Sequence, residues 1–224
     1  MLRSSQVISV RLKADMMVKL IVCDYDGTIF DTFKIVYDML HSLDKEFNFS
    51  VFTSRKALKD IYMDNFYKSL RKSCSEADLS GFKKLLEKEN KKKAGSLKLF
   101  KGMKKILKQL KKHYKLAIIS SNFKSAMKKA LKKNDIDFFD AILGAGKIES
   151  KVEKFKILEK RFKLKPNEVV YVCDTVGDIK EAKKAKVKTI GVTWGYHEKN
   201  RLSKAKPDKI ISRPEQLIKA VENL

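Results

Sequence analysis

The chain has few cysteines and no long apolar segment, and both absences limit what it can be. Its 224 residues include three cysteines, at positions 23, 74 and 173. That scattering forms neither a disulfide framework nor a zinc-type spacing, so a reducing cytoplasm is the simplest setting. No apolar run approaches the roughly 20 residues needed to cross a bilayer. We therefore expect a cytoplasmic protein with no membrane partner.

Arginine is also scarce, although the chain is strongly basic. Only seven of the 51 basic residues are arginines, and with 27 acidic residues the net charge is +24. Arginine is the side chain best suited to recognising phosphates and bases, and the basic residues are spread over every expected helix. We therefore interpret the charge as a bias toward lysine. It predicts attraction for anionic substrates and only weak, non-specific binding of nucleic acid.

Residues 1–16 lack the apolar centre of a secretory signal. They carry Arg3, Arg11 and Lys13 before the first acid, so a short organellar presequence is one interpretation. We favour a loose extension or an early start codon, because Met16 and Met17 both stand immediately before the first expected strand.

The most informative segment follows the apolar run at residues 20–23. It reads Asp-Tyr-Asp-Gly-Thr from Asp24 to Thr28, where a buried strand would end in a tight polar turn. Carboxyl ends of strands form the ligand-binding edge of an α/β sheet. Asp24 and Asp26 are two residues apart and would point to one side, so one can attack or bind metal while the other transfers protons. Taken alone, the segment could equally be an Asp-rich turn that closes an ordinary strand.

Two later apolar runs also end in polar groups. Residues 116–119 precede Ser120, Ser121 and Asn122, whose backbone N–H groups before a helix would cradle a phosphate, although serines also cap helices. Residues 169–173 precede Asp174 and Asp178, which can converge on one magnesium ion because that cation prefers oxygen ligands. Asp178 has a second interpretation as a charge that complements a helix dipole.

The order and spacing of these segments resemble those of the haloacid dehalogenase-like hydrolases, from residue 17 to the C-terminus. In this resemblance the family motifs correspond, in order, to the segment from Asp24 to Thr28, to Ser120, to Lys151, and to Asp174 with Asp178. Residues 189–196 and 206–211 are similar to the end of the phosphoglycolate phosphatase-like branch. Cys173 stands where the family usually has glycine, and Lys101 where proline is common. Neither departure removes a reactive group.

The apolar spacing predicts helices from residue 32 to about 47 and again through 61–70 and 82–86, with no strand between 31 and 95. Strand and helix patterns alternate elsewhere. We therefore expect an α/β fold with a doubly wound parallel sheet, formed by residues 17–32 and 99–224, and a small all-helical insertion at 33–98. The family resemblance implies that this insertion is a mobile cap.

The resemblance also implies a function. It predicts a phosphatase that hydrolyses a small phosphorylated metabolite, phosphoglycolate being one candidate, through an aspartyl phosphate. Asp24 would be the nucleophile, Asp26 the acid and base, and Lys151 the catalytic and phosphate-binding cation. Phosphate would also contact Thr28, Ser120, Ser121 and Asn122. The Mg²⁺ cofactor would be held by Asp24, the Asp26 backbone, Asp174 and Asp178. The protein would be a monomer or a homodimer.

Several alternatives stay open at this point. A sugar phosphomutase would use the same residues, and a polynucleotide-end phosphatase or nucleic-acid-binding protein would use the basic surface. A catalytically silent protein and a dehalogenase are disfavoured, because the complete acid set would have no purpose. Lys147 lies close to Lys151, but Lys151 stands at the start of the expected helix, as in the resembled branch. Cys23 and Cys173 each precede an aspartate on a strand and should be buried, free thiols.

Overall fold

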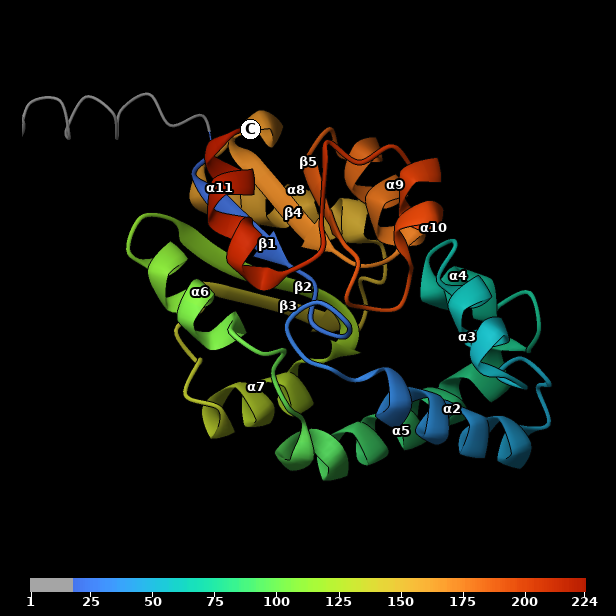
Figure 1. Cartoon of the computed structure of the whole chain (residues 1–224). Coiled ribbons are helices and arrows are strands. Elements are labelled where there is room, and N and C mark those ends of the chain that lie inside the picture. The colour runs from blue at the N-terminus through green and yellow to red at the C-terminus, as the bar shows by residue number, and fades with distance from the viewer. Residues whose placement is uncertain (1–17) are drawn as a thin grey trace, which may run out of the picture.

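The computed structural model describes residues 18–224, so the extension assigned to residues 1–16 lies outside the described residues. Six parallel strands form one sheet in the order β3-β2-β1-β4-β5-β6 (Figure 1). The strands are β1 (Leu20–Cys23), β2 (Lys115–Phe123), β3 (Ala141–Ala145), β4 (Val169–Cys173), β5 (Lys188–Val192) and β6 (Lys209–Ile211). The chain runs outward from β1 in both directions, which confirms the predicted α/β class with a doubly wound parallel sheet.

Helices cover both faces of this sheet. One layer contains α6 (Met103–Lys111), α7 (Lys124–Lys133) and α11 (Leu217–Glu222), and the other contains α8 (Lys151–Phe162), α9 (Val176–Lys184) and α10 (Lys199–Lys204). Because successive side chains on a strand point to opposite faces, Ile21 and Cys23 pack under the first layer while Leu20 and Val22 pack under the second. The central strand β1 is therefore buried on both faces, as in other parallel sheets.

Four helices follow β1 and pack into a separate unit. They are α2 (Phe33–Phe47), α3 (Arg55–Ile61), α4 (Phe66–Leu70) and α5 (Glu76–Lys93). Their shared core is aromatic and centres on Phe52, Phe66 and Phe82. The two connections to the sheet run side by side, since Phe30 forms an antiparallel bridge with Leu99. This helical unit lies over the carboxyl ends of the strands (Figure 1).

Short 3₁₀ turns complete the chain at η1 (Ala94–Ser96), η2 (Pro166–Glu168) and η3 (Pro214–Gln216). Among the described residues, no helix is both long and apolar enough to cross a membrane.

The charges are unevenly divided between the helical layers. Lysine occurs in every α-helix, as expected, but residues 90–134 contain 16 lysines and neither Asp nor Glu. This segment forms the end of α5, η1, α6, β2 and α7, and we call its exposed part the lysine layer. It is continuous in space, because α7 packs against η1 and Lys129 Nζ donates to the Lys91 carbonyl. In the opposite layer, α8 and α9 include four acids among their basic residues, and α10 has none.

Candidate active site

The first acidic segment forms a tight turn at the carboxyl end of β1. The Asp24 N–H donates to the Val172 carbonyl at 2.8 Å, so the ladder with β4 continues to this residue. The backbone then turns at Gly27, which has φ +72°. A Cβ atom there would lie 2.1 Å from Asp174 Oδ2, so glycine allows the turn to approach the fourth motif.

Asp174 and Asp178 come from the end of β4 and the first turn of α9. Thr175 caps this helix, because its Oγ1 accepts a hydrogen bond from the Asp178 N–H at 3.3 Å. Asp174 is held by the Tyr196 N–H at 2.7 Å and by the Thr28 hydroxyl at 3.0 Å. The Thr28 hydroxyl, predicted to face a phosphate, donates to this carboxylate, and its contact with phosphate stays a prediction.

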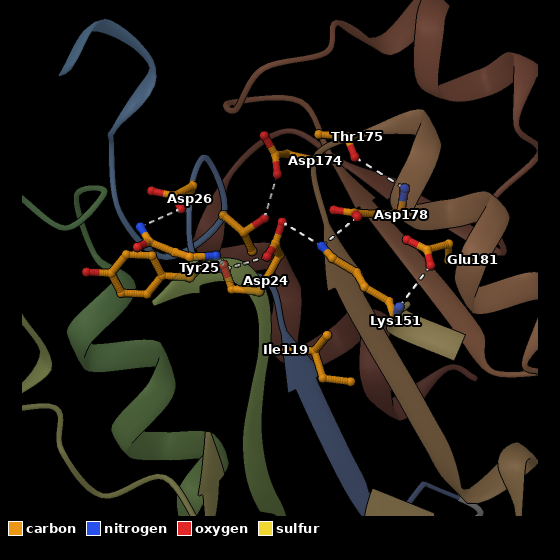
Figure 2. Close-up of polar contacts among 12 residues, drawn as sticks. Asp24, Tyr25, Asp26, Ile119, Lys151, Asp174, Thr175, Asp178 and Glu181 are labelled. Carbon is orange, nitrogen blue, oxygen red and sulfur yellow. Dashed lines mark hydrogen bonds and ion pairs between the residues drawn. The ribbon is translucent and has the colours of Figure 1, made fainter. Parts of the chain in front are cut away.

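Three carboxylates meet at this edge of the sheet (Figure 2). Asp24, Asp174 and Asp178 are buried, and each offers an oxygen within 4.8 Å of the others. Burial raises the pKa of Asp24 well above its usual value, and the neighbouring Asp178 and Asp174 raise it further, against the opposing charge of Lys151. Burial is also the main cause that raises the pKa of Asp174, to about 7. Such a donor set, short of positive charge, fits a divalent cation that prefers oxygen.

Lys151 reaches the same point from the first residue of α8. Its Nζ lies 3.3 Å from Asp24 Oδ2 and 2.5 Å from Asp178 Oδ1 (Figure 2). Burial alone would lower the pKa of Lys151, but the charges of Asp178 and Asp24 outweigh burial and raise this pKa. Glu181 fixes the start of the helix by accepting the Lys151 N–H at 2.8 Å. Lys147, by contrast, is exposed in the loop after β3.

Asp26 stands apart from the three clustered carboxylates. Its Oδ2 accepts a hydrogen bond from Asn122 Nδ2 at 3.0 Å, and its buried Oδ1 has no partner among the described residues. Burial raises the pKa of Asp26, although hydrogen bonds from Asn122 and Thr32 partly oppose the shift. The Asn122 amide, predicted to bind phosphate, donates one N–H to Asp26 and accepts the Phe123 N–H in this structure, and its contact with phosphate stays a prediction.

Three consecutive carbonyls at the end of β2 are held by side chains from three other elements. Ile119 accepts from the Tyr171 hydroxyl at 3.5 Å, Ser120 from Lys154 Nζ at 2.8 Å, and Ser121 from the Tyr67 hydroxyl at 3.1 Å. The Ser120 hydroxyl accepts the Asn122 N–H at 3.0 Å. The segment that was expected to cradle a phosphate is thus fixed from several sides.

Lys154 was not singled out from the sequence. It is 2 % exposed, and burial followed by the charge of Lys151 lowers its pKa to about 8. The available signal was its spacing, because residues three apart on a helix share a face and Lys151 already faced the site.

Comparison with known proteins identifies the family of this chain. Residues 21–192 match the sequence model of the family described as haloacid dehalogenase-like hydrolase. The chain belongs to this family. It is 27% identical over 211 residues to the phosphoglycolate phosphatase of Synechococcus elongatus, and the aligned region covers 91% of this chain and 97% of that protein. It is 23% identical to pyrophosphatase PpaX of Bacillus mycoides, with 91% and 96% covered.

A solved structure agrees with the family in fold. The crystal structure of a predicted phosphoglycolate phosphatase from Haemophilus somnus superposes with a TM-score of 0.75 at 22% identity, covering 92% of this chain and 99% of that one. The protein is therefore a haloacid dehalogenase-like hydrolase in both sequence and fold, and it is an enzyme.

The helical unit closes over the acidic centre of this hydrolase. A cavity of about 20 Å³, which we call the carboxylate cavity, lies among Asp24, Asp26, Ser120 and Lys151, with Tyr62 and other residues of the helical unit opposite them. A neighbouring cavity of about 30 Å³ touches Asp26 and Ser121 and extends between α2 and α5; we call it the apolar cavity. Each has room for about one or two water molecules.

Several hydrogen bonds join the helical unit to the hydrolase core. His197, which is fully buried, accepts the Val176 N–H at Nδ1, and its Nε2 lies 2.8 Å from the Lys59 carbonyl. The Gly177 N–H donates to the Tyr62 carbonyl at 2.9 Å. Both contacts lie beside Asp174 and Asp178, so closure of the helical unit and the geometry of the acidic centre are linked.

Proposed function

We propose that this hydrolase is a magnesium-dependent phosphatase that hydrolyses a small phosphomonoester through an aspartyl phosphate on Asp24. The observation that carries the proposal is the difference in surroundings between the two carboxylates of the first acidic segment. Asp24 lies with two other acids and Lys151, whereas Asp26 lies outside that cluster and its Oδ1 has no partner within residues 18–224. The first arrangement suits attack on phosphorus, and the second suits proton transfer.

The residues present fit the metal that the family resemblance implies. Asp24, Asp174, Asp178 and the Asp26 backbone carbonyl would hold Mg²⁺, which offsets the repulsion between an anionic nucleophile and an anionic phosphate. Burial raises the pKa of Asp24 and of Asp174, and the neighbouring Asp178 raises both further, so a divalent cation bound there would relieve the repulsion among these carboxylates.

In the first chemical step, an Asp24 carboxylate oxygen attacks phosphorus and the ester P–O bond breaks. Asp26 gives its proton to the departing alkoxide. The raised pKa of Asp26 supports this role, since a buried carboxyl group keeps its proton closer to neutral pH. In the second step Asp26, now a carboxylate, takes a proton from water as that water attacks phosphorus. The bond to Asp24 then breaks and inorganic phosphate leaves.

The negative charge on the transferring oxygens would be stabilised by Lys151, the Ser120 hydroxyl and the backbone N–H groups beside it. Preorganised donors of this kind usually contribute the largest single part of catalysis. The helical unit at residues 33–98 acts as a cap in this proposal. It must open to admit a substrate, because the closed carboxylate cavity of about 20 Å³ is far smaller than a phosphomonoester.

A phosphate-release assay with 4-nitrophenyl phosphate tests the proposal. We expect turnover that needs added Mg²⁺ and disappears in Asp24→Asn, because an amide is a poor nucleophile and a weaker metal ligand. Asp26→Asn should accumulate a protein species heavier by one phosphoryl group, because the water-activating base is lost. Undiminished turnover in excess chelator refutes the metal assignment, and an active Asp24→Asn variant refutes the covalent route.

A further inference from the structure

The cavity beside the proposed acid is mostly apolar. Asp26 lines both cavities, so the leaving alcohol that it protonates can enter the apolar cavity between α2 and α5. The side chains that line its far side are Val36, Met39, Leu40, Phe66 and Leu86. All of these belong to the apolar core of the helical unit.

The polar groups at the apolar cavity are few and uncharged, apart from Asp26 itself. They are Tyr62, Asn90, Ser121 and Asn122. Asn90 already donates its amide to the Leu86 carbonyl at 2.8 Å, and Asn122 is bound to Asp26. Burial, with the charges of Asp26 and Asp24, raises the pKa of Tyr62, so its hydroxyl stays neutral. These groups can recognise one hydroxyl or carbonyl oxygen, and they cannot neutralise an anion.

No lysine or arginine of residues 18–224 lines the apolar cavity. Three cations of the helical unit are held by acids elsewhere: Arg71 and Lys83 contact Glu149, and Lys59 contacts Glu198. The adjoining carboxylate cavity offers no spare cation, since Asp64 and Glu181 line it with the catalytic acids and its Lys151 is paired with Asp24 and Asp178. An anionic leaving group would therefore be buried without a partner, which is strongly unfavourable.

We infer that the substrate is a monoester whose leaving alcohol is uncharged and largely apolar, so that the transferred phosphoryl group is its only anion. The inference rests on the proposed phosphatase function and narrows its substrate class. The inferred substrate class differs from the substrates in the names of the relatives, because phosphoglycolate and pyrophosphate each carry a second anionic group beside the phosphoryl group that is transferred.

Two esters of equal size test this inference on the unmodified enzyme. Phosphoglycolate and phosphoglycolamide differ only in a carboxylate against a neutral amide. We expect kcat/KM to be at least about tenfold higher for the amide, because the carboxylate loses its hydration without gaining a partner. Butyl phosphate should also exceed pyrophosphate. Equal or reversed preferences overturn the inference while leaving the phosphatase function intact, and failure to hydrolyse any ester overturns both.

A matched pair of variants tests the cavity directly. Met39→Lys places an ammonium at the apolar cavity on an unbranched side chain of similar length, and it should shift the preference toward phosphoglycolate by about tenfold. Met63→Lys adds the same charge in the loop between α3 and α4, outside the apolar cavity, and should leave the preference unchanged. An equal shift in both variants shows a surface-charge effect and refutes the cavity assignment. If Met39→Lys does not fold, the two matched esters still decide the question.

Discussion

The Lys154 ammonium lies 2.8 Å from the Ser120 carbonyl oxygen, in the interior of the protein. A peptide unit is planar, and its C=O and N–H point in opposite directions when it is trans. The bond from Lys154 therefore fixes the direction of the Ser121 N–H as well. Ser121 lines the carboxylate cavity, so a lysine that need not touch the substrate orients part of its proposed binding site.

Lys154→Met should weaken the binding of inorganic phosphate by about tenfold, the equivalent of one hydrogen bond to a charged group. The melting temperature should stay equal or rise, because replacing a buried charge with an apolar side chain of similar volume is often neutral or stabilising. Titration calorimetry and thermal unfolding measure the two quantities.

Lys156→Met is the control for Lys154, since Lys156 is exposed on the same helix. Lys154→Arg should retain most of the phosphate affinity. Hydrogen exchange at residues 120–122 should quicken in Lys154→Met and not in Lys156→Met. Unchanged exchange together with unchanged phosphate affinity would show that Lys154 is merely an internal packing residue.

Lys151 and Lys147 should differ sharply when replaced. Lys151→Ala should lower kcat by about 10²- to 10³-fold, as the loss of one preorganised electrostatic group usually does. Lys147→Ala should match the wild-type enzyme, because its side chain is exposed in the loop after β3. Steady-state kinetics with one ester measures both, and the opposite ranking would remove Lys151 from the mechanism.

Mg²⁺ should stabilise the protein more at neutral pH than in mild acid. The pKa of Asp174 rises from 3.8 to about 7 on folding without metal, so the folded state holds the extra proton between these values. Protonation of Asp174 therefore contributes to the stability of the metal-free protein. This contribution is complete below about pH 4 and is lost as the pH rises through about 7. The metal must displace that proton, so its stabilising effect grows over the same range.

The measurement is the increase in melting temperature on adding Mg²⁺ at about pH 5.5 and about pH 7.5. Burial also lowers the pKa of His197, and this shift makes the stability of the protein rise with pH. Because this effect is present with or without metal, it largely cancels when the two melting temperatures are subtracted. Asp174→Asn should remove most of the Mg²⁺ effect. A larger effect in acid than at neutral pH would argue against carboxylate ligands.

Cys23 and Cys173 should resist a thiol reagent in the native protein, whereas Cys74 should react faster. Both strand cysteines are buried and free, and burial raises the pKa of Cys23 to about 12. They also face opposite helical layers and cannot pair with each other. Mass spectrometry after short labelling gives the order of reaction, and rapid labelling of all three would contradict the buried assignment.

Much of the sheet and its acidic edge could be predicted from the sequence, because strands buried on both faces leave unbroken apolar runs that end at the ligand edge. The runs before Asp24, Ser120 and Asp174 are β1, β2 and β4, as expected. Lys151 could be placed because it stands at the first residue of a helix that the chain spacing requires. These features depend on local pattern and on strand order.

Side-chain partners could not be predicted in the same way. The hydrogen bonds from Thr28 to Asp174 and from Asn122 to Asp26 form because the turns bring these side chains within reach, and no sequence spacing indicates them. Lys154 was hidden among many lysines, since only the packing of α8 against the sheet shows that it is buried. The apolar cavity depends on the facing sides of α2 and α5, whose relative rotation no sequence spacing determines.

The lysine layer gives the molecule an electrical polarity that its net charge alone does not describe. Helices α6 and α7 carry nine lysines and neither Asp nor Glu, although Lys104 and Lys111 pair with Asp135 and Asp140, whereas α8 and α9 carry eight basic and four acidic residues. In an external field or beside a charged surface, the protein would turn its α6 and α7 side toward negative charge. A negatively charged chromatography matrix would hold it in one preferred orientation, and ionic strength would set how firmly.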